Sequence, residues 1–218
     1  MSDVLARPSA AFTAPTLEQL RPDLQLIAGL VPEGSRVLDI GCGDGSLLAH
    51  LRMAKGVDGR GIELERPLVK GALARGVPVI QGDADADLVH YPDNSFDITI
   101  LSKTLQVTRD TRGVLENLVR IGRRAIVSVP NFGHWRARLQ LGLQGRMPRN
   151  RHMPYEWWDT PNIHFCTIRD FAELCDAIGA KVEARHVLSA EGRPVAAGSV
   201  FANLIGQQAV FVLGRGDG

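Results

Sequence analysis

The sequence lacks the features that would direct a protein to a membrane, to nucleic acid or to an oxidising compartment. Its longest apolar stretches are only strand length, so we expect no membrane span and no signal peptide. With 25 basic and 24 acidic residues the formal net charge is +1, which gives no electrostatic reason to expect nucleic-acid or membrane binding. The three cysteines are odd in number and have no paired spacing. They predict reduced thiols in a cytoplasmic protein, and no metal site of the zinc type.

The length of 218 residues is ordinary for one α/β unit, which can bury a sizeable core. Residues 1–16 are rich in Ala, Pro, Ser and Thr and have no apolar centre. We therefore predict a mobile leader over residues 1–16 and a single domain over residues 17–218.

A glycine-rich loop at residues 37–45 is the most informative feature. The run Val-Leu-Asp-Ile-Gly-Cys-Gly-Asp-Gly ends in glycines at alternate positions. Glycine allows positive φ and close approach of the backbone to a ligand, and the amides that open the next helix offer a partly positive end. A dinucleotide fingerprint would need glycine at position 46, which is Ser46, and Asp39 precedes the first glycine by two residues. Both differences favour S-adenosylmethionine over NAD.

Acidic residues follow at the spacing that an adenosyl ligand needs. Glu63 lies 22 residues after Gly41, at the end of a second expected strand, close to the roughly 20-residue spacing of a carboxylate that accepts from both ribose hydroxyls. The third expected strand runs into residues 82–84, where an acid and a free amide would read the amino edge of adenine. Cys42 is interpreted as a small filler and not as a nucleophile. The predicted ligands of S-adenosylmethionine, or of S-adenosylhomocysteine, are Asp39, Gly41, Cys42, Gly43, Asp44, Gly45, Glu63, Leu64, Gly82, Asp83, Ala84 and Ser102.

Strand and helix patterns alternate along the chain. The predicted helices are residues 17–30, 46–53, 66–75, 111–121 and 167–178, the last with Thr167 as its cap and Gly179 ending it. The first predicted strand lies at residues 37–40, and residues 61–64 are the end of the second. The other predicted strands cover residues 77–81, 96–101, 124–129, 182–188 and 208–213. No helix-length pattern joins the last two strands, which predicts an antiparallel pair. The fold class is therefore α/β: a Rossmann-like class I methyltransferase sheet, mostly parallel with an antiparallel final strand and helices on both faces.

A segment from Asn131 to Thr167 is inserted after the fifth strand, at the edge where parallel sheets open their ligand crevices. It holds all three tryptophans, three of the six histidines, and five arginines against two acids. Trp135, Leu139 and Leu143 recur at helical spacing, and we expect them to form a buried face. The arginines outside that face are available to bind a carboxylate or phosphate.

Four blocks of sequence resemble the family of the methionine biosynthesis protein MetW. They are Leu38–Gly45, Pro130–Trp135 (Pro-Asn-Phe-Gly-His-Trp), Gly145–Pro148 (Gly-Arg-Met-Pro) and Met153–His164 (Met-Pro-Tyr-Glu-Trp-Trp-Asp-Thr-Pro-Asn-Ile-His). The first block is general among S-adenosylmethionine enzymes, and the others are specific to this family. The resemblance covers the chain from Arg21 onward. It implies a role in methionine synthesis beside a homoserine O-acyltransferase, an α/β-hydrolase-fold enzyme that such a protein supports.

Two functions lead at this point: a regulatory subunit that binds S-adenosylmethionine, and a methyltransferase acting on a small anionic molecule. A third, a nucleic-acid methyltransferase, is poorly supported because the charge is balanced. Self-association is also open. His164 is the candidate base, because imidazole titrates near neutrality, and the alternative is that it ties the insertion to the sheet. Lys103 is a candidate anchor for an anion. The alternative is that its side chain is only solvated in an exposed loop. The predicted substrate or partner residues are Lys103, Gln106, Asn131, His134, Trp135, Arg136, Arg138, Tyr155 and Trp157.

Overall fold

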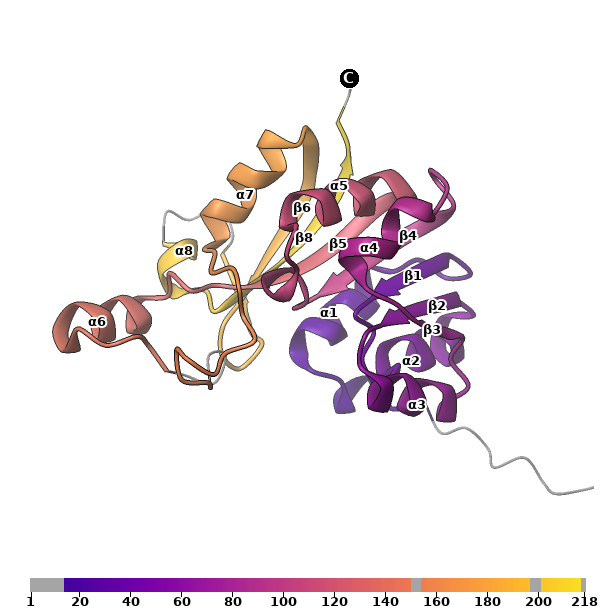
Figure 1. The fold of residues 1–218 in the computed structure, drawn as a ribbon, viewed down its shortest axis with the longest axis horizontal. Coiled ribbons are helices and arrows are strands. Elements are labelled where there is room, and N and C mark those ends of the chain that lie inside the picture. Colours follow the sequence, from indigo (N-terminus) through magenta and orange to yellow (C-terminus); the bar gives the residue numbers. More distant parts are fainter. Residues whose placement is uncertain (1–13, 150–153, 197–200, 217–218) are drawn as a thin grey trace, which may run out of the picture.

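The protein is described by a computed structural model that covers residues 14–149, 154–196 and 201–216. One eight-stranded sheet runs through it in the order β3-β2-β1-β4-β5-β8-β6-β7 (Figure 1). Strands β1 to β5 are parallel to one another, and β8 is antiparallel to both of its neighbours, β5 and β6. This confirms the predicted mostly parallel sheet with an antiparallel final strand. The strands are β1 (Arg36–Ile40), β2 (Asp58–Glu63), β3 (Val79–Gln81), β4 (Phe96–Ser102), β5 (Gly122–Pro130), β6 (Ala180–Leu188), β7 (Pro194–Val195) and β8 (Gln208–Arg215).

Helices cover both faces of this sheet, and each face has its own apolar core. On one face, α1 and α2 pack on alternate residues such as Val37, Ile98 and Ile126. On the other face, α5 and α7 pack on the residues between them, such as Leu38 and Val127. Alternation of strand side chains between two buried faces explains the near-continuous apolar runs of the central strands. The helices are α1 (Pro22–Leu30), α2 (Ser46–Lys55), α3 (Arg66–Ala74), α4 (Ala84–Asp87), α5 (Thr111–Ile121), α6 (Trp135–Gln144), α7 (Ile168–Ala177) and α8 (Ala202–Ile205).

The largest difference from the predicted elements lies at the amino-terminal end. Instead of one helix over residues 17–30, a short 3-10 helix, η1 (Leu17–Gln19), precedes α1. Pro22 occupies the first turn of α1 and Arg21 before it is extended, because a residue preceding proline is disfavoured in the α region. Of the predicted leader, residues 1–13 lie outside the described residues, while Ala14 packs against the α1–α2 core.

The helix of the inserted segment corrects a prediction. Trp135, Leu139 and Leu143 are exposed by 41%, 50% and 78%, so the expected buried face does not exist. Helix α6 extends away from the sheet at one end of the molecule (Figure 1), and within it only Ala137 is buried. Among the described residues, no helix is both long and apolar enough to cross a bilayer.

Candidate functional site

The glycine loop between β1 and α2 has the backbone that its sequence predicts. Gly41, Gly43 and Gly45 have φ values of 70°, 59° and 73°. A Cβ on Gly41 would collide with Thr104, and one on Gly45 would lie 2.9 Å from the Cβ of Ala72. A Cβ on Gly43 would meet no atom within 4 Å. The first and third glycines therefore allow close packing, whereas the middle one borders open space that a ligand could fill.

Asp39 lies beneath this loop as a buried acid with an unused acceptor. It is 3% exposed, and its Oδ1 has no hydrogen-bond partner among the described residues. Burial raises the pKa of Asp39 to about 7, with the charge of Arg21 opposing the rise and that of Glu63 adding to it. A buried acceptor without a donor is costly, so this oxygen is suited to a ligand that brings a donor or a positive charge.

Glu63, at the end of β2, holds the loop in place. Its Oε2 accepts from the backbone N–H of Gly43 at 2.8 Å, and its Oε1 accepts from that of Glu65 at 2.9 Å. A carboxylate offers about four acceptor positions, so lone pairs remain for the ribose hydroxyls. Leu64, the next residue, is exposed.

Two other loop residues face the protein itself. Burial raises the pKa of the Cys42 thiol, and its Sγ occupies the space beside Gly61, which agrees with its interpretation as a filler. Asp44 forms an ion pair with Arg75 at 2.7 Å and accepts from Ser46. Burial alone would raise the pKa of Asp44, but these contacts outweigh it and the pKa is lowered.

At the end of β3, the residues expected to read adenine open the short helix α4. The Asp83 side chain accepts from the N–H of Asp85 at 3.0 Å, and its own N–H donates to Asp87 at 2.7 Å. Gly82 donates to the carbonyl of Glu63. Ala84 is the first residue of α4, where a backbone N–H has no partner within the helix.

Sequence reasoning missed a buried polar cluster around Asp23 of α1. Ser102 donates to Asp23 Oδ2 at 2.9 Å, and Arg21 Nη2 donates to the same oxygen at 3.1 Å and to the Ser102 hydroxyl at 3.0 Å. The ammonium group of Lys103 lies 3.5 Å from Asp23 Oδ1. Lys103 is thus no solvated loop lysine, and its φ of 54° is uncommon outside glycine. The missed signal was an acid inside an apolar helical stretch.

The inserted segment is tied to the loop after β4. The N–H groups of Ile163 and His164 both donate to the Gln106 carbonyl, and the Gln106 side chain donates to the Lys103 carbonyl at 2.6 Å. The His164 ring lies 3.4 Å from the Arg109 carbonyl. These contacts support the alternative in which His164 fastens the insertion.

The start of the insertion is also held internally. The buried Asn131 donates to the carbonyls of Asn203 and Gly206 and accepts from Gly133, and Arg138 donates to the Gly133 carbonyl. His134 accepts from Arg136 as the cap of α6, and burial, followed by the charge of Arg136, lowers its pKa.

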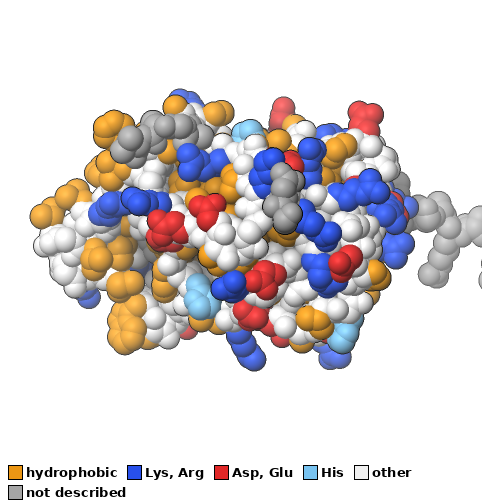
Figure 2. Space-filling view, turned by 90° about the horizontal axis from the view of Figure 1, so that it is seen from above, with side chains coloured by type: hydrophobic (Ala, Val, Ile, Leu, Met, Phe, Trp, Pro, Cys, Tyr) orange, Lys and Arg blue, Asp and Glu red, His pale blue; other side chains and the backbone are white. Residues whose placement is uncertain are grey.

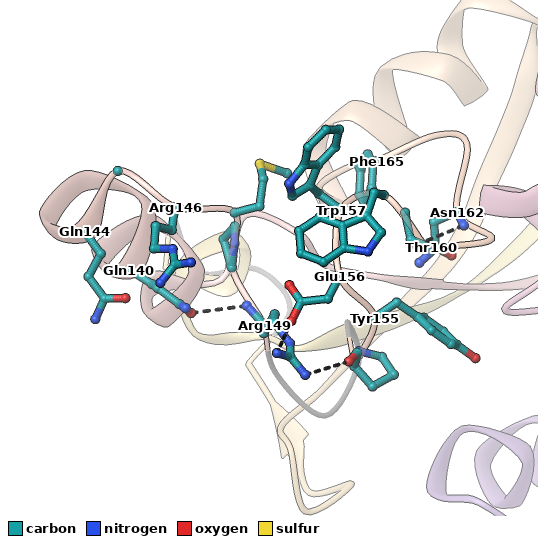
Figure 3. A pocket seen from close by; sticks show the side chains of 15 residues that line it. Gln140, Gln144, Arg146, Arg149, Tyr155, Glu156, Trp157, Thr160, Asn162 and Phe165 are labelled. Carbon is teal, nitrogen blue, oxygen red and sulfur yellow. Dashed lines mark hydrogen bonds and ion pairs between the residues drawn. The ribbon is translucent and has the colours of Figure 1, made fainter.

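Beyond this turn, α6 and residues 145–165 form an arm, the name we use for residues 135–165. Its described residues line an open cavity of about 1080 Å³, in which Arg149 joins Gln140 of α6 to Glu156 (Figure 3). Tyr155, Trp157 and Phe165 also line it. Hydrophobic side chains gather on the surface of this end of the molecule (Figure 2). Arg151 and His152 of the arm lie outside the described residues.

The described residues fit an adenosyl cofactor better than a metal. They contain no group of three or more His, Cys, Asp or Glu side chains placed to hold a metal ion. The unpartnered oxygen of Asp39 and the open space over Gly43 suit a ligand that approaches the backbone and carries a positive group.

Solved structures share this fold. An S-adenosylmethionine-dependent methyltransferase from Mesorhizobium loti matches with a TM-score of 0.66 and 15% identity over 92% of this chain and 100% of that one. A possible histamine N-methyltransferase from Thermotoga maritima matches with a TM-score of 0.63 and 20% identity over 89% and 87% of the two chains. These likenesses establish the class I methyltransferase fold.

Sequence comparison is more specific. A bifunctional methionine biosynthesis protein MetXA/MetW from Rhodopirellula baltica is 33% identical over 173 residues, which are 75% of this chain and 28% of that protein. The chain thus spans little more than a quarter of this relative. The family model for the methionine biosynthesis protein MetW matches residues 21–213. The chain belongs to the MetW family, a family of methionine biosynthesis with the fold of S-adenosylmethionine-dependent methyltransferases.

Proposed function

We propose that the chain binds S-adenosylmethionine or S-adenosylhomocysteine at the glycine loop and supports a homoserine O-acyltransferase through protein contact. One observation carries the binding half: a buried Asp39 oxygen without a partner, next to open space over Gly43. The relative named MetXA/MetW supports the partner half, because a fusion keeps two polypeptides at high effective concentration.

The binding half is tested by thermal unfolding with S-adenosylhomocysteine. A ligand at about 100 times its dissociation constant adds roughly 2.7 kcal/mol to the free energy of unfolding. For a domain of this size the melting temperature then rises by about 5–10 °C. An unchanged melting temperature at saturating concentrations of both adenosyl ligands would contradict the binding half.

Glu63→Ala and Glu65→Ala form a matched pair for the ribose contact. Hydrogen bonds to charged groups are worth about 1.5–3 kcal/mol, so Glu63→Ala weakens ligand binding about ten- to a hundredfold. The Glu65 side chain caps nothing at α3, so Glu65→Ala leaves the affinity unchanged. Calorimetric titration decides, and the melting temperature without ligand checks that both variants fold.

The arm is the proposed contact surface for the acyltransferase. Aromatic and arginine side chains dominate the energetics of protein interfaces, and the arm exposes Trp135, Trp157 and Trp158 beside several arginines. Arg136 stacks 5.3 Å from the ring centre of Trp135. A helix that buries only Ala137 of its own side chains leaves this face available for a partner.

Co-purification with the acyltransferase, followed by an acyl-transfer assay with and without S-adenosylmethionine, tests the partner half. Arg136→Ala is the sharpest variant, because Arg138 also fastens the turn at Gly133. We expect Arg136→Ala to reduce both complex formation and support of acylation while cofactor affinity stays the same. Full retention of both would leave the arm as a structural extension only.

Methyl transfer to a small anion is the second candidate, with His164 as the base. The arm's cavity has arginines in its lining, yet none of the predicted cofactor residues borders it. An acceptor bound there would lack contact with the glycine loop, so the geometry favours the regulatory subunit. Transfer of a labelled methyl group to a small acid by the purified chain would reverse this preference.

A further inference from the structure

One stretch of chain, residues 103–110, contacts both the glycine-loop end of the molecule and the arm. We call it the linking segment. It follows β4, contains the 3-10 helix η3 (Leu105–Val107) and ends at Asp110, the N-cap of α5. Its first residue, Lys103, has a φ of 54°, a conformation that is unfavourable for lysine and persists only where neighbouring groups hold it. The position of the linking segment therefore depends on its contacts with the rest of the molecule.

The linking segment rests on both sides of the proposed adenosyl site. At the glycine loop, Thr104 packs so closely on Gly41 that a Cβ on this glycine would collide with the Thr104 side chain. At the end of β3, the N–H of Asp85 donates to the Asp83 side chain at 3.0 Å. The Asp85 carboxylate accepts from two backbone N–H groups of the linking segment, each at 2.9 Å. A ligand that fixes the glycine loop and the start of α4 also fixes the residues on which the linking segment rests.

The same segment holds the arm where its carboxyl-terminal end returns to the sheet. The N–H groups of Ile163 and His164 donate to the Gln106 carbonyl at 2.8 and 3.1 Å. The His164 ring lies 3.4 Å from the carbonyl of Arg109, and the N–H of Arg109 is one of the two that Asp85 accepts. Contacts thus run from both sides of the adenosyl site through the linking segment, and they end at the same two residues of the arm.

We propose that the linking segment couples the two binding events, so that an adenosyl ligand at the glycine loop strengthens docking of the acyltransferase on the arm. This inference rests on the proposed function and adds its regulation. Either partner orders the linking segment when it binds, so the second partner to bind loses less conformational entropy. Such coupling is reciprocal, and each partner raises the affinity of the chain for the other by the same factor.

Two affinities, each measured under two conditions, test the coupling. The acyltransferase is titrated with the chain in the absence and in the presence of saturating S-adenosylhomocysteine. S-adenosylhomocysteine is titrated into the chain alone and into the chain saturated with acyltransferase. We expect both affinities to rise by the same factor, about fivefold or more. Affinities that stay unchanged or fall in the presence of the other partner overturn the coupling.

Asp85→Ala and Asp97→Ala form a matched pair of variants. Each removes a carboxylate that accepts a backbone N–H from a distant part of the chain, but Asp97 accepts from Arg36 at the other end of the sheet, at 2.9 Å. We expect Asp85→Ala to keep both single affinities and to lower the coupling factor towards one, whereas Asp97→Ala keeps the wild-type factor. Asp85→Asn, which retains one acceptor oxygen, keeps part of the coupling. A wild-type factor in Asp85→Ala, with melting temperatures showing that both alanine variants are folded, overturns the role of the linking segment.

Failure of the proposed function gives a different pattern. If S-adenosylhomocysteine binds but the acyltransferase does not, only the partner half fails, and amide hydrogen exchange decides the coupling. The ligand is then expected to slow exchange at Ile163 and His164, whose N–H groups donate to the linking segment, in the wild type but not in Asp85→Ala. Equal exchange with and without ligand in the wild type overturns the coupling. If the chain binds neither adenosyl ligand, the binding half and the coupling are both wrong.

Discussion

The glycine-loop end and the arm use buried and exposed side chains in opposite ways. At the glycine loop, the acidic side chains of Asp39 and Glu63 are buried: Glu63 accepts from two backbone N–H groups, whereas Asp39 Oδ1 has no partner among the described residues. On the arm, large apolar side chains such as Leu143 and Trp157 are exposed. A buried acceptor without a donor lowers the stability of an isolated chain, and exposed apolar side chains contribute little to it. Each region therefore agrees with the occupant proposed for it above: a small polar ligand at the loop, and a protein at the arm.

The comparison is sharpened most by removing one aromatic ring from the body and one from the arm. Phe171 is 1% exposed and packs on Phe211 with ring centres 4.5 Å apart, so Phe171→Ala lowers the free energy of unfolding by about 3–5 kcal/mol. Trp157 is 68% exposed, and Trp157→Ala changes it by less than about 0.5 kcal/mol. Denaturant unfolding of both variants measures this. A comparable loss in Trp157→Ala would mean that the arm is part of the folding core.

The next effect is the pH dependence of stability that Asp39 contributes at the loop end. The pKa of Asp39 is raised from 3.8 to about 7, so between these pH values the folded chain keeps a proton that the unfolded chain has lost. The free energy of unfolding then falls as pH rises, by an amount of the order of 4 kcal/mol.

Asp39→Asn isolates this contribution because asparagine does not titrate. We expect the stability of the wild type relative to Asp39→Asn to decline from pH 4 to pH 7 and then to level off. Chemical denaturation of both proteins at a series of pH values provides the measurement. Parallel pH profiles would show that Asp39 is already ionised in the folded chain at low pH.

The glycine-loop end and the arm also differ in how far the sequence predicts them. The conformation of the glycine loop and the position of Glu63 at the end of β2 could be predicted from the sequence. Positive φ favours glycine, and the acid follows the loop at a fixed spacing along the chain. The Arg21–Asp23–Ser102 contacts could not, because Ser102 lies 79 positions from Asp23 and meets it only in the folded sheet.

The arm shows the limit of periodicity. The spacing of Trp135, Leu139 and Leu143 correctly predicted a helix, but the prediction that their face is buried was wrong. Periodicity tells which residues share a face of a helix. It does not tell whether the same chain or another molecule covers that face.

A smaller effect separates backbone conformation from ligand binding. Gly43 and Gly34 have φ values of 59° and 66°, and a Cβ on either would meet no atom within 4 Å. Alanine at each position costs about 1 kcal/mol for the left-handed conformation. Only Gly43→Ala places a methyl group in the proposed ligand space, so only this variant loses affinity for S-adenosylhomocysteine. Equal affinity of the two variants would place the ligand elsewhere.

The smallest effect on stability is expected from substitutions of exposed apolar side chains, which on the arm should instead lower the affinity for the partner. Leu143 and Met53 are exposed by 78% and 72%, on α6 and on α2 of the body. Serine at either position changes the free energy of unfolding by less than about 0.5 kcal/mol, because little apolar surface was buried there. If the acyltransferase docks on α6, however, Leu143→Ser removes apolar contact area from that interface, and its affinity for the enzyme falls while that of Met53→Ser does not. Titration of the acyltransferase with each variant, with melting temperatures as the folding control, measures the difference. If both variants bind the acyltransferase as tightly as the wild type does, Leu143 is not part of the interface. If both lose the same affinity, the arm contributes no more to binding than the exposed apolar side chains of the body do.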